Sequence, residues 1–120
     1  MSMGSYNKSF APARTDFDWL SVNRENVDRY IADPLCGFPF TVNGYYNMFL
    51  GISRIMDPKN LDHMPKKLPV LFISGDRDPV GDMGAGVEKS AELFRKHGME
   101  NVTCRLYPGD RHEILNEENR

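Results

Sequence analysis

The hydrophobic residues of this chain follow two different spacings, which divide the sequence near residue 60. In residues 1–60 they recur mainly every three or four positions, the spacing of an amphipathic helix. In residues 61–120 the short apolar run Pro69–Ser74 and the alternating run Val102–Tyr107 are typical of strands. The pattern predicts a helical domain over residues 1–60 and an α/β domain over residues 61–120.

The helical part is predicted to begin with an irregular arm. Residues 1–15 mix small and polar side chains without a sustained period, which favours a loop or an extended segment. An apolar cluster at residues 17–20 precedes Ser21, a good N-cap, and Asp33-Pro34 ends the helix that follows. One face of this first helix carries Val27, Tyr30 and Ile31.

A second amphipathic helix is predicted to begin after Thr41, as its N-cap, and to end at Asp57-Pro58. Gly44 and Gly51 lower its intrinsic stability, so packing against other parts of the protein must support it. Its apolar residues at three- and four-residue steps are Val42, Tyr45, Tyr46, Phe49, Ile52 and Ile55.

The second half of the chain predicts one βαβ unit. The run Pro69–Ser74 is continuously apolar, as in a parallel strand that is buried on both faces. The helix that follows is ended by Gly98, and the second strand covers Val102–Tyr107. Beyond it, Ile114-Leu115 starts a further apolar face that is cut off at Arg120. The inner face of the connecting helix is formed by Val87, Ala91, Leu93 and Phe94.

Composition narrows the choice of partner and location. The formal net charge of −2, with both signs interspersed, provides no field that would attract nucleic acid or an anionic membrane. Neither a run of about 20 apolar residues nor a secretion signal is present, so we expect no transmembrane segment and a cytoplasmic location. Cys36 and Cys104 fit no metal-ligand spacing and are expected to be partly buried thiols.

Two loops, each directly after a predicted strand, carry the candidate chemistry. Gly75–Val80 contains Asp78, and Pro108–Glu113 contains His112. The carboxyl ends of neighbouring parallel strands meet at one edge of a sheet, so an acid and a histidine placed there can form part of a hydrolytic triad. Gly-Asp-x-Asp-Pro is also a good turn sequence, and we expect the competing carboxylate, Asp76, to serve the turn.

Four segments of the chain resemble the C-terminal part of the α/β-hydrolases grouped as lysophospholipases, monoacylglycerol lipases and serine aminopeptidase-like hydrolases. The segments are Phe17–Ser21, Asp33–Phe38, Leu68–Val80 and Leu106–Glu117. The resemblance implies the C-terminal part of an α/β-hydrolase fold: a remnant of the cap followed by the last βαβ unit, in an incomplete sheet.

The same resemblance implies roles for individual residues. Asp78 matches the catalytic acid and His112 the catalytic base, while residues 5–56 match the end of the cap that covers the acyl pocket. The substrate would be a small amphiphilic ester, and no cofactor is implied. Residues that would line or support the pocket are Leu35, Phe38, Phe40, Tyr45, Tyr46 and Phe49.

The nucleophile expected of such a hydrolase is not in this sequence. Family members carry a Gly-x-Ser-x-Gly elbow and an oxyanion-hole loop upstream of the cap, and neither occurs here. Ser2 imitates half an elbow, but no strand precedes it and no helix follows it. His112-Glu113 lacks the second histidine of a zinc motif because position 116 is Asn, and His63 and His97 need no catalytic role, so no metal site is expected.

Three functions remain open from the sequence. The first is a C-terminal piece of a serine ester hydrolase that is inactive by itself, because an acid and a base alone have no serine to activate. The second is a non-catalytic module that binds an acyl chain, and the third is a half-enzyme completed by another chain. Because only two core strands are predicted, we expect marginal stability or self-association through the exposed sheet edge.

Overall fold

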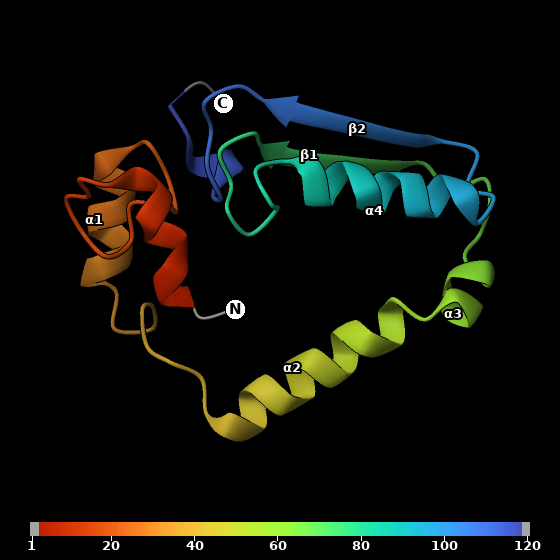
Figure 1. Cartoon of the computed structure of the whole chain (residues 1–120), viewed down its shortest axis with the longest axis horizontal. Helices are drawn as coiled ribbons and strands as arrows, with labels where there is room; N and C mark the ends of the chain where they lie inside the picture. Colours follow the sequence, from red (N-terminus) through yellow and green to blue (C-terminus); the bar gives the residue numbers. More distant parts are fainter. Residues whose placement is uncertain (1–2, 119–120) are drawn as a thin grey trace.

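The computed structural model describes residues 3–118 and shows a mixed α/β arrangement, as the sequence predicts (Figure 1). The two strands and helix α4 form one part, and the other helices and the loops form the rest. In chain order the elements are η1 (Met3–Phe10), α1 (Arg24–Ala32), α2 (Val42–Ile55), α3 (Pro58–Asp62), β1 (Val70–Gly75), α4 (Ala85–Lys96), β2 (Val102–Tyr107) and η2 (Ile114–Asn116).

The predicted βαβ unit is confirmed. β1 and β2 pair in parallel, with Val70 opposite Val102 and Gly75 opposite Tyr107. Helix α4 connects them and covers one face of the sheet (Figure 1), where the rings of Phe72 and Phe94 meet edge to face with centroids 5.0 Å apart. The apolar stripe of the connecting helix therefore packs as its spacing indicates.

The other face of the sheet is open. Leu71 is 63% exposed and Ile73 is 37% exposed, whereas a continuously apolar strand predicts cover on both faces. The expectation of burial on both faces is thus wrong for residues 3–118, because in this part of the chain α4 is the only long helix that packs on the strands and the short η2 also contacts β1. The exposed face agrees with the expectation of an incomplete sheet.

Helix α2 has the predicted position but little packing. Oγ1 of Thr41 accepts a hydrogen bond from Gly44 N at 3.1 Å, as an N-cap does. No residue of α2 is buried, and Figure 1 shows the helix lying apart from the sheet. The Cα radius of gyration is 16.2 Å, against roughly 13.5 Å for a compact domain of this length. The apolar face of α2 is therefore largely uncovered by the other described residues.

The first helix begins later than predicted, and the arm before it is helical. Residues 3–10 form the 3-10 helix η1 instead of a loop. The N-cap of α1 is Asn23, whose Oδ1 accepts from Asn26 N at 3.2 Å, and not Ser21. The hydroxyl of Ser21 instead donates to Glu117 at 2.7 Å and accepts from Asn23 N at 3.0 Å, because a buried carboxylate 96 residues away competes for it.

The segment after His112 forms a single 3-10 turn, η2, and Leu115 is exposed. Glu117 at its end is already in extended backbone, so the predicted apolar helical face does not develop before residue 118; Arg120 lies outside the described residues. Within the described chain, no helix combines the length and apolarity required to cross a membrane.

Exposure of the outer face of β1 predicts self-association of the isolated chain. Sedimentation velocity should show species larger than a monomer that increase with concentration. The double substitution Leu71→Lys and Ile73→Lys should shift the distribution toward monomer, because it places charge on the apolar face.

Glu92→Lys is the matched control, because it changes the net charge by the same two units on an exposed position of α4. It should leave the association unchanged. A wild-type chain that sediments as a monomer at all concentrations and melts in one sharp transition would contradict the prediction.

Candidate active site at the ends of the two strands

The parallel pairing of β1 and β2 continues into the two loops that follow them. Asp76 N donates to Tyr107 O at 3.0 Å, and Arg77 N donates to Asp110 O at 3.0 Å. The loops are therefore held side by side by main-chain bonds, so the residues that follow, Asp78 and His112, face one another across a short gap.

Gly75 makes this approach possible. A Cβ at this position would lie 2.1 Å from the carbonyl oxygen of Asp110, which no side chain can tolerate. Asp76 was expected to serve its own turn, but it bonds instead to the other loop: its Oδ1 accepts from Gly109 N at 2.8 Å. Its carboxylate is therefore engaged away from the histidine.

Asp78 and His112 form a hydrogen-bonded pair. Nδ1 of His112 lies 3.1 Å from Oδ2 of Asp78. Because a carboxylate only accepts, Nδ1 carries the proton and Nε2 is left with the lone pair that a base uses. Asp78 is buried, and its other oxygen accepts from Val80 N at 2.9 Å, whereas the side chain of His112 is 39% exposed.

The pair changes the acid–base behaviour of the imidazole. The hydrogen bond to Asp78 raises the pKa of His112 above its ordinary value, partial burial opposes the rise, and the charges of Asp78 and Glu113 add to it. A folded-state pKa above the unfolded value means that the pair stabilises the fold at low pH. This stabilisation is lost as the pH rises through the raised pKa.

An aromatic side chain from the first half of the chain covers the histidine. The rings of Trp19 and His112 have centroids 5.2 Å apart and an interplanar angle of 42°. Trp19 is buried, and its main-chain N donates to Oδ1 of Asn7 at 3.0 Å. Sequence reasoning placed Trp19 only in an apolar cluster before a helix. A contact between residues 93 positions apart leaves no signal in the local pattern.

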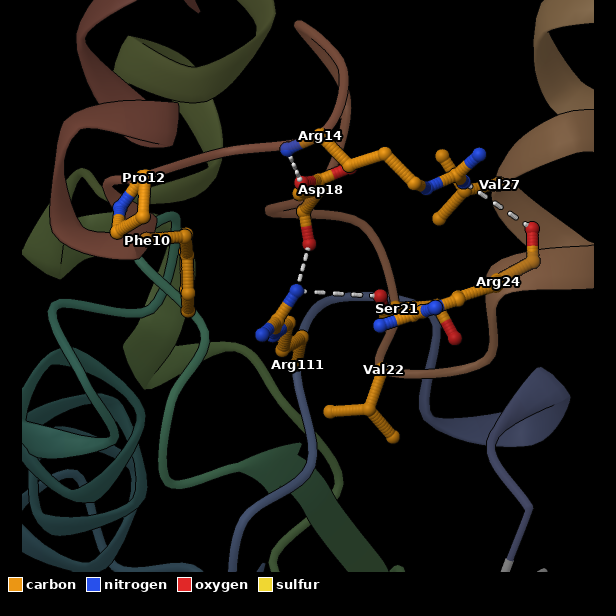
Figure 2. Close-up of a pocket in the computed structure, with 9 residues that line it drawn as sticks. All are labelled: Phe10, Pro12, Arg14, Asp18, Ser21, Val22, Arg24, Val27 and Arg111. Atoms are coloured by element: carbon orange, nitrogen blue, oxygen red, sulfur yellow. Dashed lines mark hydrogen bonds between the residues drawn. The ribbon is translucent and has the colours of Figure 1, made fainter.

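A polar pocket of about 260 Å³ lies beside the histidine loop (Figure 2). The guanidinium of Arg111 donates to the carbonyl oxygens of Asp18 and Ser21, and its central carbon lies 4.1 Å from the ring centroid of Phe10. The pocket thus marks the junction between the N-terminal arm and the loop that carries His112. It is lined by Phe10, Pro12, Arg14, Asp18, Ser21, Val22, Arg24, Val27 and Arg111.

Four of the predicted pocket residues form a row of ring contacts, with centroids 5.5–6.5 Å apart: Phe38, Phe40, Tyr45 and Phe49. Leu35 and Tyr46 are exposed and lie outside this row. Figure 1 shows α2, which carries Tyr45 and Phe49, away from the loops that follow the strands. In this arrangement the row is separate from the Asp78–His112 pair, and its role in an acyl pocket stays a prediction.

The other two histidines lie at helix ends. Nδ1 of His97, the C-cap of α4, is 2.6 Å from Oδ1 of Asp62, and this hydrogen bond lowers the pKa of Asp62. Nδ1 of His63 is 2.5 Å from the carbonyl oxygen of Lys59. Across residues 3–118, no three His, Cys, Asp or Glu side chains are grouped so as to hold a metal ion. Both cysteines are free and half-buried.

One described serine lies close to the end of the first strand. Ser74 near the end of β1 is buried and donates to Gly75 O at 3.2 Å. Ser2, the residue that imitates half an elbow, lies outside the described residues.

Comparison with known proteins gives a consistent result. The family described as Serine aminopeptidase, S33 matches residues 3–119. A highly thermostable carboxyl esterase from Bacillus coagulans, solved in complex with glycerol, superposes with a TM-score of 0.84 and 29% identity over 95% of this chain. A lipase in its open form superposes with a TM-score of 0.77 and 28% identity over 94% of this chain.

The chain spans little more than a third of either structure, 37% of the esterase and 38% of the lipase. No curated protein sequence matches it significantly.

The geometry predicts how His112 titrates. Followed by NMR in the isolated chain, its ring should have a pKa above about 6.5, and Asp78→Asn should lower that pKa because it removes the acceptor charge.

Asp76→Asn is the matched control, since it makes the same chemical change in the same loop without touching the histidine. It should leave the pKa of His112 unchanged. A larger shift in the pKa of His112 from Asp76→Asn than from Asp78→Asn would show that Asp76, and not Asp78, is the partner of the histidine.

Proposed function

Because the chain belongs to the Serine aminopeptidase, S33 family and has an α/β-hydrolase fold, we propose that it is the acid–base portion of a serine ester hydrolase. The observation that carries the proposal is the hydrogen bond between His112 Nδ1 and Asp78 Oδ2 at the ends of two adjacent parallel strands. Asp78 is the catalytic acid of the proposal, and His112 is its base.

Each member of the pair would contribute a defined step. Nε2 of His112 takes the proton of a serine hydroxyl as the oxygen attacks the ester carbonyl, and then returns that proton to the departing alkoxide. Asp78 holds the ring in the tautomer that leaves Nε2 unprotonated and stabilises the imidazolium that forms. The rise in the pKa of His112 supports this role, because its main cause is the same carboxylate.

The serine belongs, in this proposal, to a longer protein that contains these residues. The sequence itself carries no Gly-x-Ser-x-Gly. The oxyanion hole, which usually supplies the largest part of the stabilisation of the transition state, would also come from that protein. Residues 1–120 alone would therefore hydrolyse no ester.

A small amphiphilic ester, such as a lysophospholipid or a monoacylglycerol, is the proposed substrate. Two observations favour an ester over a peptide. First, the similar solved structures are a carboxyl esterase and a lipase. Second, the row of rings from Phe38 to Phe49 offers apolar surface of the kind that an acyl chain contacts.

The same exposed rings favour a second candidate, a non-catalytic module that binds an acyl chain. If this is the function, a monoacylglycerol or fatty acid should raise the melting temperature of the isolated chain, and Phe40→Ala should remove the effect. A half-enzyme completed by a separate chain would instead co-purify with that chain and gain esterase activity from it.

Assays with a p-nitrophenyl ester test the main proposal. The isolated chain should show no turnover above the uncatalysed rate. In the longer protein, His112→Ala should lower kcat by roughly 10³-fold or more, because it removes the base.

His97→Ala is the matched control, since His97 is also hydrogen-bonded to an aspartate but lies at the end of α4. It should leave kcat unchanged in the longer protein. Turnover by the isolated chain that His112→Ala abolishes would show that the nucleophile is within these residues and overturn that part of the proposal.

A further inference from the structure

Glu117 is a buried carboxylate that the sequence resemblance leaves without a role. Its side chain is 1% exposed. Oε2 accepts from Ser21 Oγ at 2.7 Å and from Val22 N at 3.0 Å, and Oε1 accepts from Arg111 N at 2.9 Å. These donors replace the water that the carboxylate loses on burial. We refer to Ser21, Val22, Arg111 and Glu117 as the Glu117 cluster.

The cluster joins two segments that are about 90 residues apart in the chain, and it does so on both sides of the histidine. Arg111, whose main-chain N bonds to Glu117, directly precedes His112 in the chain. Glu113 N, on the other side, donates to Leu20 O at 2.7 Å. The histidine loop is thus tied to residues 20–22 on both sides of His112. Before His112 the tie runs through the side chains of Glu117 and Arg111, and after it Glu113 N bonds directly to Leu20 O.

Residues 20–22 directly follow Trp19, so the cluster also sets where the indole ring lies. With the Glu117 cluster in place, the imidazole has Asp78 at Nδ1 and the ring of Trp19 against its face, 5.2 Å away. Tyr6 packs on Trp19 with a centroid distance of 5.2 Å. The imidazole is therefore limited in rotation by a hydrogen bond at one nitrogen and by a buried aromatic side chain.

We propose that Glu117 and Trp19 are positioning residues for His112: Glu117 fixes residues 20–22 to the histidine loop, and Trp19 holds the imidazole against Asp78. The inference rests on the proposed role of His112 as the base and extends it to two residues that lie outside the strands. Trp19 also favours the imidazolium that forms when His112 takes a proton, since a cation near an indole ring is attracted to it.

Trp19 provides the readout, because it is the single tryptophan of the chain. A protonated imidazole in contact with an indole quenches its fluorescence more strongly than the neutral ring. Emission of the wild-type chain should therefore rise with pH, with a midpoint at the pKa of His112, above about 6.5. His112→Ala should abolish the transition. The charged groups that act on His112 are Asp78 and Glu113.

Glu117→Gln keeps the shape of the side chain but cannot accept all of the hydrogen bonds. Its emission transition should shrink, and its midpoint should move toward about 6.5, because the imidazole is held less firmly against Asp78. Ser21→Ala removes one of the donors to Glu117, together with the hydrogen bond that Ser21 accepts from Asn23 N, and should shift the midpoint in the same direction by less. This second variant keeps the proposal testable if Glu117→Gln does not fold.

Two controls separate positioning from general loss of stability. Glu118→Gln makes the same chemical change at the adjacent, exposed position and should titrate as the wild type. Val27→Ala removes buried volume from α1 and should lower the melting temperature without moving the midpoint, provided that the measurement is made where circular dichroism shows the chain folded.

A folded Glu117→Gln or Ser21→Ala chain with the midpoint and amplitude of the wild type would overturn the proposal, and so would an equal shift in Val27→Ala. None of these readouts needs turnover. Retention of esterase activity by His112→Ala in the longer protein would refute the proposed function, whereas an unshifted Glu117→Gln titration would refute only the positioning role.

Discussion

The arrangement of the site depends on the parallel register of β1 and β2. With Gly75 opposite Tyr107, the two strands end together, and main-chain hydrogen bonds continue between the loops beyond them. Gly75 lets the backbone of the second loop approach to a distance that any side chain would prevent. An acid and a base 34 residues apart in sequence meet because the strands that carry them end at the same level.

A second constraint comes from the part of the chain outside the strands. The buried carboxylate of Glu117 and the guanidinium of Arg111 both bind the main chain around Ser21, from opposite sides of the histidine loop. The N-terminal half of the chain is thereby attached at its beginning to the site, while α2 extends away from it with its apolar face exposed (Figure 1). The attachment of residues 20–22 to the site is polar and buried, whereas the apolar face of α2 has no comparable contact with the site in the described residues.

Sequence patterns predicted the elements best where local preferences and burial agree. The alternating run at Val102–Tyr107 and the Thr41 cap were confirmed, and the resemblance pointed to Asp78 and His112, which the structure brings into contact. The N-cap of α1 was wrong, because the hydroxyl of Ser21 bonds to Glu117, a partner that no local pattern reveals. Trp19 was missed as a neighbour of His112 for the same reason: a buried contact across about 90 residues leaves no periodic signal.

In the proposed hydrolase, His112, held by Asp78, serves a serine that lies outside these residues. The most direct test is a crystal structure of the longer protein after reaction with a phosphonate ester, which attaches to the activated serine. We expect Nε2 of His112 within hydrogen-bond distance, about 3 Å, of the phosphonylated serine oxygen, with Asp78 still at Nδ1. A different histidine beside that serine, with His112 remote from it, would contradict the role of His112 as the base.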